Sequence, residues 1–219
     1  MFKRDILFHL ERWKDDTHRK PLILRGARQV GKTTVVNEFG KQFDNYLYLN
    51  LEKREAASLF ELNVSLKDLM PLFFAHCGKI RNEGTILLFI DEIQNSAKAV
   101  ALLRYFYEEL PDIYVIAAGS LLENLIDVRV SFPVGRVQYM ALRPCSFREF
   151  LGAVGEEPLL SVLDNPEITL AFHDRLMLLF NIYTLIGGMP EVVQLYAERR
   201  DILSLESTYE TLLQGYRDD

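Results

Sequence analysis

Eight residues near the start of the chain have the types and spacing needed to hold phosphate groups. The segment Gly26-Ala-Arg-Gln-Val-Gly-Lys-Thr fits the pattern G-x-x-x-x-G-K-[ST] and lies between an expected strand and an expected helix, as the pattern requires. Its glycines permit a compact loop, whose backbone N–H groups and following helix N-terminus attract an anion. We expect Lys32 to reach the β- and γ-phosphates of a nucleotide and Thr33 to place its hydroxyl on Mg²⁺. The expected nucleotide contacts are Gly26, Ala27, Arg28, Gln29, Val30, Gly31, Lys32, Thr33 and Thr34.

An acidic pair can supply the second half of such a site. Asp91 and Glu92 follow the apolar segment Ile86–Ile90, which is typical of a buried strand. Mg²⁺ needs a hard oxygen ligand, either directly or through water, and we expect the Asp91 carboxylate to be this ligand. Glu92 comes next, where it can orient and deprotonate an attacking water. A simpler interpretation of the pair is a cap at the start of a helix.

Two further positions are candidates for contacts to the γ-phosphate. Ser120 ends the expected strand 113–120 and would lie near that phosphate if its strand neighbours the one before the glycine loop. A serine there is equally consistent with an N-cap for the next helix. Arg136 is the candidate for an arginine finger, supplied to a neighbouring copy of the chain, that stabilises transition-state charge. Arg28, Arg129 and Arg143 are weaker candidates, because a lone arginine is more often a surface residue.

The elements that would position these residues alternate between strand and helix. Apolar segments suited to strands cover residues 21–25, 46–51, 85–91, 113–120 and 137–142. Helical periodicity comes before them over residues 2–13 and between them over residues 32–39, 66–80 and 100–110. From residue 146 the pattern indicates helices only. We therefore predict an α/β domain over residues 1–143, with a sheet flanked by helices, and a small helical lid over residues 144–219.

Composition argues against several other classes of protein. The net charge of −6 is unsuited to a surface devoted to nucleic acid, although a local basic patch is compatible with it. No apolar segment approaches the roughly 20 residues that span a bilayer, and the first residues lack a signal sequence, so we expect no membrane association and a cytoplasmic protein. Cys77 and Cys145 form no close metal-binding pair, and we expect Cys77 in the core.

Several segments together resemble a large prokaryotic family of AAA+-type ATPases. They are Arg25–Thr34, Phe89–Gln94, Ala118–Glu123, Gly135–Arg136 and Pro144–Phe150. The first two are common to many ATPases, whereas Asp-Glu-Ile-Gln and Ser-Phe-Arg-Glu-Phe are more specific, and the resemblance covers almost the whole chain. It implies a P-loop NTPase fold, with a five-stranded parallel sheet in the order 5-1-4-3-2 and a helical lid. It also implies ATP, rather than GTP, as the nucleotide.

Two expectations concern the C-terminal part. Gly187-Gly-Met-Pro-Glu resembles the Gly-x-Pro lid motif of signalling ATPases, in which the proline approaches adenine, so Pro190 is a candidate base contact. A helix break and restart explains the same residues equally well. Members of the resembled family usually continue into a C-terminal domain, whereas this sequence ends at Asp219 within an unfinished apolar stripe. We therefore expect residues 144–219 to include the start of a truncated C-terminal region.

Three functions are compatible with these residues. The first is binding of ATP or ADP with Mg²⁺, and hydrolysis of ATP coupled to a conformational change. The second is a nucleotide-held signalling switch, an interaction module with little turnover. The third is a P-loop phosphotransferase, which fits less well because Asp91 and Glu92 favour activation of water. The expected partners are a nucleotide, a second copy that supplies the arginine, and a protein that the sequence does not identify.

Overall fold

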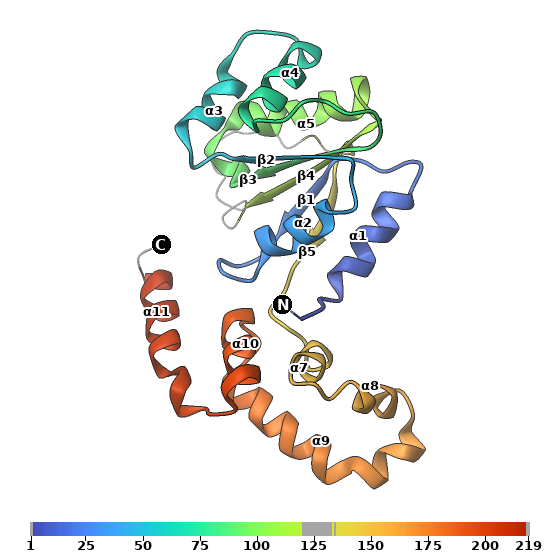
Figure 1. The fold of residues 1–219 in the computed structure, drawn as a ribbon, viewed down its shortest axis with the longest axis vertical. Coiled ribbons are helices and arrows are strands. Elements are labelled where there is room, and N and C mark those ends of the chain that lie inside the picture. The colour runs from blue at the N-terminus through green and yellow to red at the C-terminus, as the bar shows by residue number, and fades with distance from the viewer. Residues whose placement is uncertain (1, 120–132, 134, 218–219) are drawn as a thin grey trace. The chain divides into compact units, whose positions relative to one another are not determined.

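The computed structural model describes residues 2–119, 133 and 135–217. The chain forms two compact units, of which one is Phe8–Leu142 and the other combines Met1–Leu7 with Arg143–Asp219 (Figure 1). The sheet belongs to the first unit, and the second is helical. The sequence placed residues 1–7 with the sheet, whereas in the structure they group with the helical unit.

The first unit is built on a parallel sheet in the order β2-β3-β4-β1-β5. This is the expected order 5-1-4-3-2, read in the opposite direction across the sheet. Every residue of β3 is buried, which explains its unbroken apolar sequence. Since the strands are parallel, the carboxyl ends of β1, β3 and β4 lie at the same edge of the sheet. The strands are β1 (Leu22–Arg25), β2 (Asn45–Asn50), β3 (Ile86–Asp91), β4 (Ile113–Gly119) and β5 (Gln138–Ala141).

Helices cover both faces of this sheet (Figure 1). On one face α3, α4 and α5 pack against the apolar side chains of the strands, in a core that includes Phe60, Phe73 and Phe106. On the other face Trp13 of α1 contacts Phe39 of α2. The helices of this unit are α1 (Ile6–Asp15), which starts before the boundary between units, α2 (Lys32–Gly40), α3 (Arg54–Glu61), α4 (Leu66–His76), the 3₁₀ helix η1 (Ile93–Asn95) and α5 (Ala97–Glu109).

Helix α4 is shorter than the sequence predicted. It ends at His76 because Gly78 adopts a φ of 63° and the N–H of Lys79 donates back to the carbonyl of Phe74 at 2.9 Å. Ile80, expected on the apolar stripe, is therefore exposed beyond the helix end. Cys77 is half-buried against the core, where its thiol donates to the Tyr48 carbonyl at 3.6 Å.

The second unit has its own apolar core, formed by side chains from all of its α-helices and from η2. Ser146 starts α7 through a capping box, in which its hydroxyl accepts from the Glu149 N–H and its N–H donates to the Glu149 carboxylate. The elements are α7 (Phe147–Ala153), α8 (Pro158–Leu163), α9 (Pro166–Ile186), α10 (Pro190–Arg199), η2 (Leu203–Leu205) and α11 (Glu206–Arg217).

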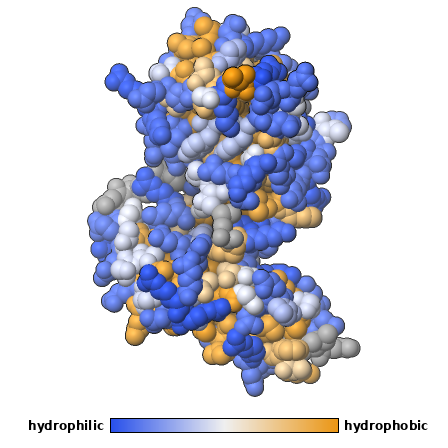
Figure 2. Space-filling model, in the orientation of Figure 1, coloured by the Kyte–Doolittle hydropathy of each residue, from blue (hydrophilic) through white to orange (hydrophobic). Residues whose placement is uncertain are grey.

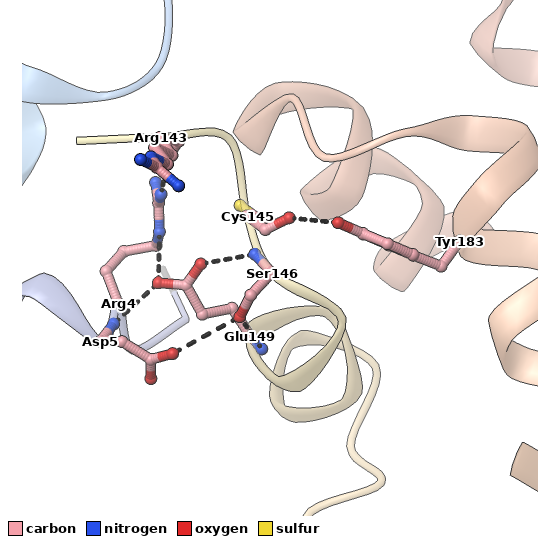
Figure 3. Close-up of polar contacts among 7 residues, drawn as sticks. All are labelled: Arg4, Asp5, Arg143, Cys145, Ser146, Glu149 and Tyr183. Carbon is pink, nitrogen blue, oxygen red and sulfur yellow. Dashed lines mark hydrogen bonds and ion pairs between the residues drawn. The ribbon is translucent and has the colours of Figure 1, made fainter. Parts of the chain in front are cut away.

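A buried ion pair ties the start of the chain to α7 (Figure 3). The Nε of Arg4 donates to Oε1 of Glu149 at 2.9 Å, and the backbone N–H of Asp5 donates to the same oxygen at 2.7 Å. Arg4 also donates to the Arg143 carbonyl at 2.7 Å. These contacts explain why residues 1–7 group with the helical unit.

The glycines between α9 and α10 allow a close approach of two backbone segments. A Cβ at Gly188 would lie 2.4 Å from the Cys145 carbonyl oxygen, and the Cys145 N–H donates to the Gly188 carbonyl at 2.6 Å. The same Cys145 carbonyl accepts from the Tyr183 hydroxyl at 2.8 Å (Figure 3). Pro190 is the first residue of α10, so a helix break and restart occurs at this motif.

Hydrophilic residues cover most of the visible face of the molecule, and apolar residues gather in patches on both units (Figure 2). In the part of the chain that the structure describes, none of the helices combines the length and the apolar character needed to cross a membrane.

Candidate functional site

The loop between β1 and α2 is held in a specific shape by its backbone. Gly31 has a φ of 92°, and Gln29, which is not glycine, has a φ of 61°. A non-glycine residue in this region costs on the order of 1–3 kcal/mol and is often found at ligand-binding sites. Val30 is fully buried and fixes the loop to the core. A Cβ at Gly26 would lie 2.4 Å from the Leu142 carbonyl oxygen, so only glycine fits there.

The side chain of Lys32, the first residue of α2, reaches back into this loop. Its ammonium donates to the carbonyls of Gly26 at 2.7 Å and Ala27 at 2.9 Å, and an ammonium carries three N–H donors. Burial lowers the pKa of Lys32, although the negative charges of Glu92 and Asp91 act in the opposite direction. The loop therefore contains a desolvated cation, which an anionic ligand would stabilise.

Asp91 and Thr33 meet at the carboxyl edge of the sheet. The Thr33 hydroxyl, in the first turn of α2, donates to Oδ2 of Asp91 at 2.8 Å. The Tyr48 hydroxyl donates to the same oxygen at 3.2 Å, and the Glu92 N–H donates to Oδ1 at 3.2 Å. Burial raises the pKa of Asp91, while the hydrogen bond from Thr33 lowers it. Two hard oxygen ligands at this separation fit the preferences of Mg²⁺, which also keeps water and phosphate ligands.

Glu92 lies directly after β3 in the left-handed region, with a φ of 52°. This backbone conformation turns the chain sharply into η1 and leaves the Glu92 side chain only partly buried. The side-chain amide of Gln94 donates to Oε2 of Glu92. Oε1 of Gln94 is buried and accepts no hydrogen bond from the described residues. The carboxylate of Glu92 is thus held by a neighbour whose own acceptor is unsatisfied.

The structure brings the expected loop residues, Asp91 and Glu92 to one edge of the sheet, but it does not bring Arg136 there. Arg136 precedes β5, whose first residue pairs with Leu22 at the start of β1, so it belongs to the opposite edge. Its guanidinium forms an ion pair with Glu108 of α5. Of the remaining candidates, Ala27, Arg28, Gln29 and Thr34 are exposed, Pro190 and Arg143 lie in the helical unit, and Ser120 and Arg129 lie outside the described residues.

Two residues of the site were missed by sequence reasoning. Tyr48 reaches Asp91 because β2 and β3 are neighbours, and burial together with Asp91 raises the pKa of Tyr48 to about 12. Gln94 follows Glu92 by two residues, and its signal was a polar side chain in a turn directly after a buried strand. Among the described residues, no cluster of three or more His, Cys, Asp or Glu side chains could hold a metal ion.

Comparisons with known proteins place this site in a family. Residues 18–151, more than half of the chain, match the family model of the AAA domain. The Walker-type ATPase of Pyrococcus abyssi is similar in structure, with a TM-score of 0.59 at 17% sequence identity, over 100% of this chain and 75% of that chain. Drosophila ORC bound to DNA gives a TM-score of 0.54 at 17% identity, over 96% of this chain and 62% of that chain.

At such low identity, the two solved structures show the fold alone. No curated protein matches the chain. The match to the AAA domain, however, spans the glycine loop, the acidic pair and all five strands. The chain therefore belongs to the AAA family of P-loop ATPases.

Proposed function

We propose that this chain binds Mg·ATP at the Gly26–Thr33 loop and hydrolyses the ATP to ADP and phosphate in the cytoplasm. The observation that carries the proposal is the 2.8 Å hydrogen bond between the Thr33 hydroxyl and the Asp91 carboxylate. It joins the phosphate-binding loop to the acidic end of β3, as a Mg·nucleotide site requires. Membership of the AAA family supports the same class of function.

Each residue has a distinct role in this proposal. The loop N–H groups and Lys32 bind the phosphates, and Lys32 can exchange its bonds to the Gly26 and Ala27 carbonyls for phosphate oxygens. Thr33 and Asp91 would hold Mg²⁺, directly or through water. When bound, the ion neutralises charge on the phosphate oxygens. Glu92 orients the attacking water and accepts its proton as the new bond to the γ-phosphorus forms and the bond from that phosphorus to the bridging oxygen breaks, so that ADP leaves with this oxygen.

Three further contacts would come from a second copy of the chain and from other segments of this chain. An arginine from a second copy of the chain would stabilise transition-state charge. Arg136 is our candidate, because it is partly exposed and lies away from the nucleotide site of its own chain, where it could reach the site of a second copy. We assign the γ-phosphate contact to Ser120 and the adenine contact to Pro190. Hydrolysis would be coupled to movement of the helical unit, which acts as the lid.

A second function, the nucleotide-held switch, is favoured by one observation. The Gln94 amide donates to the carboxylate of Glu92, so it competes with water for the proposed base. In a switch this bond would suppress turnover, and Gln94→Ala should then raise the ATPase rate several-fold without weakening nucleotide binding. In an active ATPase the same bond would position Glu92, and Gln94→Ala should lower the rate. Steady-state turnover of both proteins therefore separates the two functions.

Nucleotide binding itself is tested by thermal denaturation with ATP or ADP and Mg²⁺. A ligand at 100 times its Kd should stabilise the folded chain by about 2.7 kcal/mol. Lys32→Ala should lose this stabilisation. Lys41→Ala is the matched control, because Lys41 is an exposed lysine just beyond the C-terminal end of the same helix. A parent protein that remains folded but is stabilised by neither nucleotide would refute the proposal.

A further inference from the structure

Helix α9 has two apolar faces, and the described residues cover only one of them. Leu176, Leu179 and Ile186 are buried in the core of the helical unit. At 3.6 residues per turn, a second set of large apolar side chains projects from the opposite side of the helix. Its members are Leu170, Met177, Leu178 and Leu185, which are 84%, 43%, 52% and 68% exposed. We call these four residues, together with Asp174 and Asn181 between them, the outer face of α9.

An exposed apolar stripe along a helix of 21 residues, about 31 Å long, needs an explanation. The six residues of the outer face fall within about 100° of the helix circumference, which is the width of a helix-packing surface. The outer face contains no lysine or arginine, and its polar side chains are one carboxylate and one amide. Such a composition is suited to packing against another helix.

The order of residues on the outer face has a two-fold pattern. The midpoint of the face lies between Met177 and Leu178. Outer-face residues at equal distances on either side of this point are similar in size. The matched pairs are Leu170 with Leu185, Asp174 with Asn181, and Met177 with Leu178.

We propose that α9 pairs in an antiparallel manner with α9 of a second copy of this chain, across a two-fold axis that passes between residues 177 and 178. In such a closed, symmetric contact each residue meets its matched residue in the other copy. Leu170 packs against Leu185 of the second copy, and the Asn181 amide donates to the Asp174 carboxylate.

The polar pair also selects the direction of pairing. In a parallel, in-register pair Asp174 would face another Asp174, and two carboxylates would repel each other near the centre of the contact. The antiparallel arrangement replaces this repulsion by two hydrogen bonds between Asp174 and Asn181. The leucines and methionine provide the apolar contact in both directions, so the charge pattern decides between them.

The size of the surface indicates a weak and reversible dimer. One helix face on each side buries less than the roughly 800 Å² per partner of a standard interface. We therefore expect a dissociation constant on the order of micromolar. Because every residue of the outer face belongs to the helical unit, dimerisation should occur without nucleotide. This inference is independent of the proposed ATPase activity.

Sedimentation velocity without nucleotide, over about 1–200 µM protein to bracket the expected constant, tests the dimer. The parent should shift from monomer to dimer across this range. Leu178→Asp places a charge beside the axis and should leave a monomer at every concentration. Leu203→Asp is the control, because Leu203 is an exposed leucine of the same unit that lies outside α9. A parent that stays monomeric, or a Leu203→Asp variant as impaired as Leu178→Asp, would overturn the inference.

Substitutions at one position test the antiparallel geometry. Asn181→Lys would face Asp174 of the second copy twice per dimer, and it should tighten association roughly 2- to 30-fold, less at high salt. Asn181→Asp would face the same carboxylate and should weaken association. Both variants alter an exposed residue, so both should fold. Equal effects of the two substitutions, or effects of the reverse sign, would exclude this pairing.

Discussion

The hydroxyl of Thr33 and the carboxylate of Asp91 lie 2.8 Å apart although 58 residues separate them in the chain. The first turn of α2 provides the hydroxyl, and the last residue of β3 provides the carboxylate. Their contact depends on the parallel sheet, which brings the ends of β1, β4 and β3 to one edge.

Nucleotide affinity should decrease at alkaline pH because of Lys32. Burial lowers the pKa of Lys32, whereas a bound phosphate would raise it. At a pH where Lys32 of the free protein is deprotonated, nucleotide binding therefore requires uptake of a proton. The affinity for ADP should therefore fall as pH rises through the lowered pKa, with a limiting slope of about tenfold per pH unit. Isothermal titration calorimetry from about pH 7 to 10 measures this, and it brackets the region below the reference lysine pKa. A Lys32→Arg variant should lose this pH dependence. If the affinity of the parent protein for ADP does not change across that range, the prediction is contradicted.

Asp91→Asn should stabilise the nucleotide-free fold while it removes the proposed Mg²⁺ ligand. Burial raises the pKa of Asp91 above its ordinary value of 3.8, so the folded state binds this proton more tightly than the unfolded chain. The contribution of Asp91 to the free energy of unfolding is therefore lost as pH rises from near 3.8 through the raised pKa. In urea denaturation, the free energy of unfolding of the variant should increase relative to that of the parent as pH rises across this window. A difference that does not change with pH would contradict the assignment.

Removing Arg4 should destabilise the helical unit strongly. The side chains of Arg4 and Glu149 are only 5% and 6% exposed, and Arg4→Met leaves the Glu149 carboxylate buried without its cation. The expected cost is about 3–5 kcal/mol. Arg148→Ala is the control, because its pair with Asp164 is exposed and should contribute less than about 1 kcal/mol. Denaturant titrations that give similar losses for both variants would count against the role of burial.

Two glycines of the helical unit should respond in opposite directions to alanine. A Cβ at Gly188 would overlap the Cys145 backbone, so Gly188→Ala should cost about 1–3 kcal/mol. Gly152 lies within α7, and a Cβ there meets no atom within 4 Å, so Gly152→Ala should stabilise by up to about 1 kcal/mol. Thermal melting compares the two, and a neutral Gly188→Ala would show that the segments can separate freely.

The alternation of strands and helices could be predicted because it depends on local patterns and on a motif of known context, whereas the strand order was implied by the resemblance to AAA+-type ATPases. Buried parallel strands have unbroken apolar sequences, and the glycine loop fixes which strand precedes a helix. Helix α3 was missed because it is short and buries only Ala56 and Phe60. The end of α4 was misplaced because the left-handed glycine at position 78 outweighs an apolar residue that continues the period.

The contacts that could not be predicted join distant parts of the chain. Tyr48 reaches Asp91 across two neighbouring strands, and Arg4 reaches Glu149 over 145 residues. Neither contact leaves a periodic trace in the sequence, because each depends on how the elements pack. The placement of Asp91 and Glu92 could be predicted because they lie at the end of a strong apolar strand pattern, whereas their polar partners required the structure.

The ATPase rate of Glu92→Gln, measured beside its ATP affinity, tests the central claim most directly. The substitution keeps the size of the side chain and removes the base, while Lys32, Thr33 and Asp91 remain to bind Mg·ATP. General-base catalysis typically contributes roughly 10²–10⁴ in rate, so the variant should bind ATP like the parent and hydrolyse it slower by that factor. Glu38→Gln, at a partly exposed glutamate of α2, should keep the parent's rate. A Glu92→Gln variant that hydrolyses ATP at the parent's rate would contradict the account.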